Sequence, residues 1–423
     1  MSTDSIAQSF DLIVCGGGMV GASLVAALLP SAERLGLRIA LIEQNPIEPT
    51  ANPQYQPSFD ARSTALAAGS RTLLEAMGVW PSLKQHLTSI KKIEVSARGQ
   101  FGQTQMDALQ EQVPALGYVV ENHWMGQVLM SQLRPFLNSV VNLYSPAKVL
   151  SIKSASPVGS VEIECDGQRQ TLCAPLVVMA DGGRSDLRAA MGIEYSQRDY
   201  KQHALVANIA LDRPHLGVAY ERFTEAGPIA LLPIESADGQ ARMGLVWTLE
   251  DDKVDALIDA DDRSFLRQLQ QAFGYRAGAF TRVGQRYTYP LKRVLADEQV
   301  RTGLIVLGNA AHSLHPIAGQ GFNLAVRGVA ELAQLIIKRK EAGLPLGDLA
   351  VLQDFIEKRR RDQRRTIVFG DTALKVFMSA NPFIRLGRSI GLQALDIVPA
   401  ARTVLARAAM GLDTPAARLE SDD

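Results

Sequence analysis

The chain has 423 residues, of which 47% are hydrophobic and 21% are charged, an ordinary composition for a globular protein. Lysine plus arginine and aspartate plus glutamate number 44 each, so the formal net charge is zero and gives no reason to expect a nucleic-acid partner. The first residues do not form a signal peptide and no run of about 18 apolar residues occurs, so we expect a cytoplasmic protein that does not cross a membrane.

The N-terminal segment has the pattern of a strand, a glycine-rich turn, a helix and a second strand. Phe10 to Val14 is a short apolar strand, followed by the GxGxxG turn Gly16-Gly17-Gly18-Met19-Val20-Gly21 and a helix to about Leu29. Leu37 to Ile42 predicts the next strand, which ends at Glu43. This order and spacing predict a dinucleotide-binding βαβ unit.

Each feature of this unit has a physical role. Gly16 and Gly18 allow the tight turn and the close approach of a pyrophosphate, whose charge the helix N-terminus stabilises. Gly21 lets the helix pack on the strands, and Glu43 is placed to hold ribose hydroxyls. Glu43 as a solvated strand end is the alternative. The sequence has no second complete unit of this kind, which argues against two bound dinucleotides.

The next segments mix loops, helices and strands. Residues 45–57 are rich in proline, asparagine and glutamine and predict a surface loop. We expect a helix to begin at Asp60-Ala61-Arg62-Ser63-Thr64-Ala65-Leu66, with Asp60 or Ser63 as its N-cap. Strands and a helix alternate over residues 91–154, and the apolar run 172–180 ends at Asp181.

A different pattern occupies about residues 200–289. Short alternating segments at Ala204–Ala210, Ile229–Pro233 and Met243–Leu249 predict a mainly antiparallel sheet, interrupted by a helix at Asp262–Phe273.

A second glycine-rich segment, Gly308 to Asn323, follows the strand-like run Leu304–Leu307 and precedes an apolar helix at Leu324–Ile337. Its small residues allow close approach to a large flat ligand, and a helix N-terminus after Gly319-Gln320-Gly321 offers free N–H groups to an anion. Two such turns far apart in the sequence suggest one extended cofactor held at several points.

Metal and disulfide chemistry is not expected. Cys15, Cys165 and Cys173 lack metal-ligand spacing, and we expect reduced thiols. His312 and His315 are followed by Pro316, and their segment contains no carboxylate, so we expect His312 to position the cofactor and expect no metal.

Four motifs together carry a resemblance. The GxGxxG unit, Asp60-x-Arg62, Ala180-Asp181-Gly182-x-x-Ser185-x-x-Arg188 and the Gly308–Asn323 segment resemble, in order, the signatures of the FAD-dependent aromatic hydroxylases of the p-hydroxybenzoate hydroxylase type. The resemblance spans about residues 10–330 and is greatest for the ubiquinone-biosynthesis branch. It implies an α/β fold, in which a Rossmann-like FAD-binding domain is interleaved with a mainly antiparallel β-sheet substrate domain and followed by C-terminal helices.

The resemblance also implies domain limits and site residues. The FAD-binding domain would comprise residues 1–85, 121–190 and 296–340, the substrate domain 86–120 and 191–295, and the C-terminal helical region 341–423. The residues implied to bind FAD are Gly16, Gly18, Gly21, Glu43, Arg62, Asn122, Asp181, Gly308, Asn309, Pro316, Gly319, Gly321, Phe322 and Asn323. The family usually has an acid at the position of Asn309. This departure favours the branch that acts on 2-polyprenyl-6-methoxyphenol.

The implied reaction uses FAD, with NAD(P)H as a transient co-substrate, and molecular oxygen. Reduced FAD would react with oxygen to give a flavin hydroperoxide, which hydroxylates the polyprenylated phenol to the 1,4-benzoquinol in ubiquinone biosynthesis. Five tyrosines could deprotonate the phenol, and the sequence does not choose among them. Alternatives are another ring position or aromatic substrate, or a non-catalytic subunit that binds other ubiquinone-biosynthesis proteins.

The C-terminal region has a basic run, Lys358 to Arg361 with Arg364 and Arg365. A solvated helix face is one interpretation. The other is a contact with a partner protein or with the inner membrane surface, through which a polyprenyl tail would enter the pocket.

Overall fold

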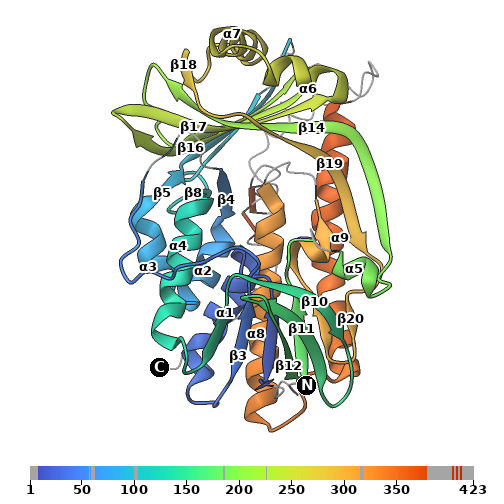
Figure 1. The fold of residues 1–423 in the computed structure, drawn as a ribbon. Helices are drawn as coiled ribbons and strands as arrows, with labels where there is room; N and C mark the ends of the chain where they lie inside the picture. Colours follow the sequence, from blue (N-terminus) through green and yellow to red (C-terminus); the bar gives the residue numbers. More distant parts are fainter. Residues whose placement is uncertain are drawn as a thin grey trace.

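The computed structural model describes residues 8–56, 58, 62–99, 103–183, 186–224, 226–314, 319–378, 403, 406, 407, 410 and 411. Two layers of structure lie one above the other in Figure 1. The lower part holds a six-stranded sheet with its helices, and the upper part is a large sheet roofed by helices α6 and α7.

The lower sheet is parallel except at one edge. Its order is β20 (Val300–Arg301), β21 (Leu304–Val306), β13 (Leu176–Met179), β2 (Leu12–Cys15), β3 (Ile39–Ile42) and β9 (Val141–Tyr144). Strands β2, β3 and β13 are buried along their whole length, as expected for a parallel sheet covered on both faces.

Different elements cover the two faces of this sheet. Three helices pack on one face: α1 (Met19–Ala32), α4 (Asn122–Leu133) and α8 (Gln320–Glu341). The other face meets a four-stranded sheet of β1 (Gln8–Ser9), β12 (Gln168–Ala174), β11 (Gly159–Cys165) and β10 (Ala147–Lys153). Successive strand residues therefore alternate between two apolar cores.

The upper sheet has nine strands. Their order is β22 (His312–Ser313), β19 (Tyr287–Ala296), β14 (Tyr195–Leu211), β17 (Gln240–Glu250), β16 (Gly227–Ala237), β15 (Val218–Thr224), β6 (Lys92–Ala97) and β7 (Gln103–Asp107), with β18 (Phe280–Val283) pairing β14. All named pairs are antiparallel except β15 with β6. Helices α6 (Asp251–Ile258) and α7 (Asp262–Phe273) cover the outer face with an apolar core.

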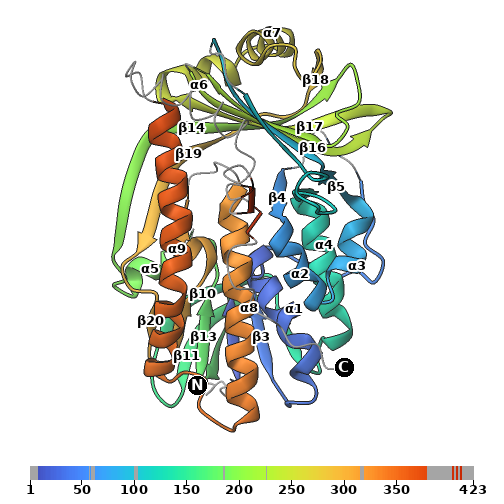
Figure 2. The ribbon, with the colours of Figure 1, turned by 180° about the vertical axis from the view of Figure 1, so that it is seen from behind.

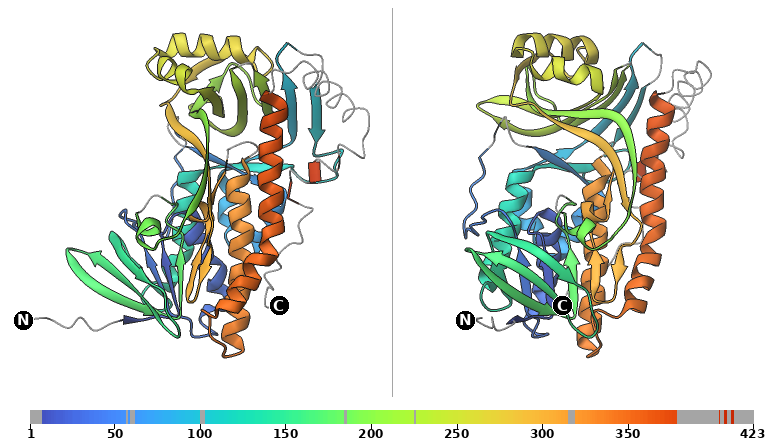
Figure 3. Two further views of the ribbon diagram at one scale, coloured as in Figure 1. Left: turned by 90° about the vertical axis from the view of Figure 1, so that its right-hand side faces the viewer. Right: turned by 45° about the vertical axis from the view of Figure 1, so that its right-hand side comes forward.

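A small sheet of β4 (Ser63–Ala67), β8 (Gly117–Glu121) and β5 (Leu87–Ile90) stands between the two layers. The shorter elements are α2 (Ala68–Ala76), α3 (Trp80–Leu83), α5 (Leu187–Ala190) and the 3₁₀ turns η1 (Lys84–His86), η2 (Arg134–Phe136) and η3 (Gly308–Ala310). Helix α9 (Leu349–Met378) runs beside α8 and rises to the upper sheet (Figures 2 and 3).

The predicted fold class is confirmed, with one local correction. We expected a helix to begin at Asp60–Leu66, but Ser63–Ala67 is strand β4 and pairs with β8, and the helix starts only at Ala68. The pairing with β8 overrides the local sequence preference. Asp60 lies outside the described residues. The three cysteines are free thiols.

Candidate functional site

A cavity of about 1750 Å³ lies between the lower unit and the upper sheet. Ordinary small-molecule pockets measure roughly 300–1,000 Å³, so this one has room for a dinucleotide and a second molecule. The lining divides into a polar part near the starts of α1 and α8 and an apolar part under β6, β7, β15, β16 and β17.

The turn between β2 and α1 is very tightly packed. Gly16 has φ +114°, and a Cβ there would lie 2.5 Å from the Ala180 carbonyl oxygen. A Cβ at Gly21 would lie 1.9 Å from the Gly16 oxygen. Gly18 differs, because no atom lies within 4 Å of a Cβ built there. The first two glycines are required by the turn itself, and Gly18 leaves space open on the cavity side.

Glu43 braces this turn from the end of β3. Its Oε2 accepts a hydrogen bond of 2.8 Å from the Gly17 amide, and its Oε1 accepts two from Asn45. The carboxylate is half-buried and lines the cavity, so it fixes the turn and also faces the cavity.

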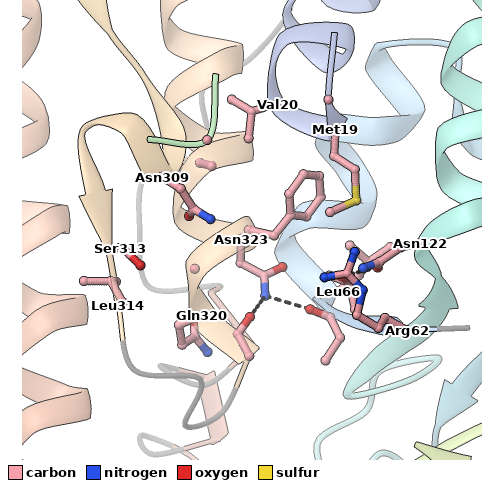
Figure 4. Close-up of a pocket in the computed structure, with 18 of the residues that line it drawn as sticks. Met19, Val20, Arg62, Leu66, Asn122, Asn309, Ser313, Leu314, Gln320 and Asn323 are labelled. Carbon is pink, nitrogen blue, oxygen red and sulfur yellow. Dashed lines mark hydrogen bonds between the residues drawn. The ribbon is translucent and has the colours of Figure 1, made fainter. Parts of the chain in front are cut away.

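Arg62 and Asn122 lie side by side on the opposite wall (Figure 4). The Asn122 amide donates to the Arg62 carbonyl at 2.8 Å, and Thr64 Oγ1 donates to Asn122 Oδ1 at 2.6 Å. The Arg62 guanidinium lies 5.6 Å over the Tyr289 ring. Residues from β4, α4 and β19 thus meet here.

Asn323 fixes the start of α8 with its side chain. Its Oδ1 accepts hydrogen bonds of 2.8 Å from the Ala67 amide and the Ser70 hydroxyl. Its Nδ2 donates at 2.9 Å to the carbonyls of Ala65 and Gly319, as drawn in Figure 4. The buried amide therefore joins β4 and α2 to the N-terminus of α8 and keeps little capacity for a ligand.

Most of the residues implied to bind the cofactor line this cavity: Gly16, Gly18, Glu43, Arg62, Asn122, Asp181, Asn309, Gly319, Gly321, Phe322 and Asn323. Gly21 and Gly308 stand behind it, and Gly308 has φ +64° with its α-carbon packed against Val20. Pro316 and His315 lie outside the described residues.

His312 does not line the cavity, so our expectation that it positions the cofactor is wrong. The ring is buried in β22. Burial and the nearby guanidinium of Arg359 lower the pKa of His312 to about 4. The neutral ring of His312 is therefore part of the core. The small apolar residues around it in the sequence did not reveal this.

The basic run on α9 is partly turned inward. The Arg359 guanidinium is buried, lies 3.1 Å from Glu331 and donates to the Leu324 carbonyl. Lys358 pairs with Asp354 and Arg360 with Glu357 on the same helix. Arg361, Arg364 and Arg365 are exposed. In the described part of the chain, no helix is long and apolar enough to span a membrane.

Comparison with known proteins places the chain in a family. The profile of the FAD binding domain family matches residues 9–343. The chain belongs to this family. It is 32% identical to the ubiquinone hydroxylase UbiL of Rhodospirillum rubrum, over 97% of this chain and 91% of that protein. It is 27% identical to the 3-demethoxyubiquinol 3-hydroxylase of Escherichia coli, over 96% and 99%.

A solved structure agrees with this assignment at the level of fold. The p-nitrophenol 4-monooxygenase PnpA of Pseudomonas putida superposes with a TM-score of 0.76 at 16% identity, covering 96% of this chain and 99% of that one. The chain is thus a FAD-dependent aromatic monooxygenase of the branch that contains ubiquinone-biosynthesis hydroxylases.

The geometry of the cavity fits FAD. The amides at the start of α1 and the open space at Gly18 suit a pyrophosphate, and Glu43 suits a ribose. At the far end, α8 begins at Gln320 after Gly319 in the left-handed conformation, with no side-chain cap on its first amides. These amides suit the electron-rich end of a reduced flavin ring.

Proposed function

We propose that the protein hydroxylates the ring of a polyprenylated phenol in ubiquinone biosynthesis. The observation that carries the proposal is the continuity of one cavity from the glycine turn at Gly16 to the apolar face of the upper sheet at Leu232 and Val246. A dinucleotide fills only part of this space. The rest has the apolar lining that a phenol with a hydrocarbon tail requires.

The bound FAD, reduced by NAD(P)H, supplies electrons to molecular oxygen so that one oxygen atom can be transferred to the ring. Gly16–Gly18 and Glu43 would hold the cofactor, and the amides at the start of α8 would stabilise negative charge on its ring. The upper sheet covers the reaction space and excludes water, which would otherwise divert the oxygen to hydrogen peroxide.

For the substrate itself, we propose 2-polyprenyl-6-methoxyphenol, converted to the 1,4-benzoquinol. Asn309 supports this choice. It lines the cavity, and the resemblance described from the sequence implies an acid at this position in most of the family. Hydroxylation at another ring position is the second candidate, since one relative is named a 3-demethoxyubiquinol 3-hydroxylase.

Quinone intermediates in a strain that lacks this gene test the assignment. Accumulation of a polyprenyl-6-methoxyphenol, removed by the wild-type gene and not by a variant that cannot hold FAD, is the expected result. Accumulation of a later intermediate that already has the 1,4-benzoquinol ring would move the activity to the second candidate, and an unchanged profile would reject both.

We also propose that the exposed arginines in the middle of α9 contact the anionic inner-membrane surface. The triple change Arg361→Gln, Arg364→Gln and Arg365→Gln should weaken flotation with anionic vesicles and leave the paired Lys358 and Arg360 in place. Equal flotation of the triple variant and the wild type would reject this contact.

A further inference from the structure

One carboxyl group lies in the apolar part of the cavity. Along β15, Ala219, Tyr220, Glu221 and Phe223 line the cavity, although the Tyr220 ring packs 5.6 Å from the Phe273 ring of α7 on the other face of the sheet. Arg222, between them, faces the opposite side of the sheet, with its guanidinium 6.0 Å over the Phe273 ring of α7. The alternation of the strand therefore directs Glu221 into the cavity.

The register of the sheet shows what surrounds this carboxyl. Residues directly opposite one another on β7, β6, β15, β16 and β17 form a row across the strands: Thr104, Val95, Glu221, Ala230 and Val246. All five residues line the cavity, and Glu221 is the only one of the five with a titratable side chain. In the next row the neighbours include Ile93 and Leu232, which are apolar as well.

Glu221 has no protein partner within the described residues, in the form of either a hydrogen bond or an ion pair. Burial alone raises the pKa of its carboxyl to about 7. Tyr220 is next to Glu221 in the chain, and the other titratable residues of the lining come from other elements. The full set is Cys15, Glu43, Arg62, Lys148, Asp181, Asp186 and Tyr220. The carboxyl is half-buried, and its placement in an apolar setting without a partner is costly to the fold, which a ligand that bonds to it would explain.

We propose that the Glu221 carboxylate accepts the hydrogen bond of the substrate's phenolic hydroxyl and takes its proton as the ring is oxygenated. This role rests on the proposed function. The sequence did not indicate this role for Glu221. From the sequence, the candidates for deprotonating the phenol were five tyrosines.

The proton transfer completes the electron balance of the ring step. As the ring carbon bonds to one oxygen atom of O₂ reduced by two electrons, the O–O bond breaks and the other oxygen leaves as hydroxide. At the same time the phenolic O–H bond breaks, its electron pair forms a C=O bond, and its proton passes to Glu221. The hydroxide then takes the proton from the oxygenated ring carbon and leaves as water, which restores the aromatic ring, and Glu221 returns its proton to the ring oxygen. A base with a pKa near the working pH suits this exchange.

The test compares Glu221→Gln with Glu94→Gln in the FAD-loaded protein. Glu94 lies on neighbouring β6 but next to Arg276, 3.9 Å away, and does not line the cavity. The probe is 2-farnesyl-6-methoxyphenol, and its binding is followed without turnover by the change in flavin absorbance. Hydroxylated product is measured separately by mass spectrometry.

We expect the affinity of the wild type for the probe to rise roughly tenfold as pH increases through about 7, because the carboxylate is the better acceptor. Glu94→Gln should keep this profile. Glu221→Gln should bind with an affinity independent of pH and should hydroxylate roughly 100-fold more slowly or worse.

The outcomes separate the two proposals. A wild type that hydroxylates the probe but binds it equally at about pH 5 and about pH 9 would overturn the role of Glu221, even if Glu221→Gln does not fold. So would a Glu221→Gln variant with the wild-type profile. A wild type that neither binds nor hydroxylates any prenylphenol would overturn the proposed function together with this role.

Discussion

Arg242 of β17 and Glu121 of β8 form a buried ion pair, in which Nη2 lies 3.0 Å from Oε1 and the two side chains are 0% and 3% exposed. Arg242 also donates to the carbonyls of Glu235 and Ser58. Burial raises the pKa of Glu121 and the guanidinium opposes this rise. The pair joins the sheet over the substrate space to the small sheet, whose strand β4 begins directly after Arg62.

Removing one partner of this pair should leave an unpaired buried charge. Arg242→Met is expected to lower the free energy of unfolding by about 3–5 kcal/mol in urea titrations. The matched control is Arg282→Met, whose pair with Asp238 is exposed and 3.5 Å long, with an expected loss below about 1 kcal/mol. Equal losses for the two variants would contradict the importance of the buried pair.

The glycine turn allows cofactor binding to be separated from folding. Gly18→Ala should fold normally, because its Cβ meets no protein atom, yet bind FAD at least about tenfold more weakly, because the Cβ enters the space left for the pyrophosphate. Gly126→Ala in α4 is the control, since its Cβ is also free and the residue is away from the cavity. FAD titration of the two apoproteins gives the comparison. Equal affinities would refute this placement of the pyrophosphate.

The four hydrogen bonds of Asn323 predict a large effect of a nearly isosteric change. Asn323→Asp removes the donor to the carbonyls of Ala65 and Gly319 and buries a carboxylate, so we expect a loss of at least about 2 kcal/mol in stability. Chemical denaturation measures the loss. Asn52→Asp on the exposed loop serves as control, and a similar small effect in both variants would contradict the structural role.

The stability of the protein should depend on pH through Glu221. Its pKa is 4.5 in the unfolded chain and about 7 in the folded protein, so between these values the folded state holds a proton that the unfolded state has released. The contribution of Glu221 to the free energy of unfolding is therefore constant below about pH 4.5. It decreases as the pH rises towards about 7 and remains at the lower value above that pH. Relative to the wild type, Glu221→Gln should gain on the order of 3 kcal/mol between pH 4 and pH 8 in thermal unfolding. A constant difference would contradict the shift.

The parallel unit was predictable because its signals are local and agree with one another. The glycine turn between β2 and α1, the buried strands and the acid at Glu43 all lie within one short segment. In the upper layer, the helix predicted at Asp262–Phe273 begins and ends at the residues observed for α7. The long apolar alternation of the middle region likewise indicated the antiparallel sheet.

Features that depend on strand register were missed. Ser63–Ala67 has an alanine-rich sequence that suits a helix, and only its pairing with β8 makes it a strand. The place of Glu221 follows from the pairing of β15 with β6 and β16, which no local pattern specifies. Asn323 lies in a recognised motif, but its partners on β4 and α2 are more than 250 residues away in the chain.

The most direct test of the account is the fate of oxygen. Purified, FAD-loaded protein is supplied with NADH or NADPH, 2-farnesyl-6-methoxyphenol and ¹⁸O₂, and the product is examined by mass spectrometry. We expect a farnesyl-methoxy-benzoquinol that carries one ¹⁸O atom, with NAD(P)H consumption stimulated by the phenol. A product labelled only from water, or NAD(P)H consumption that yields hydrogen peroxide and unchanged phenol, would contradict it.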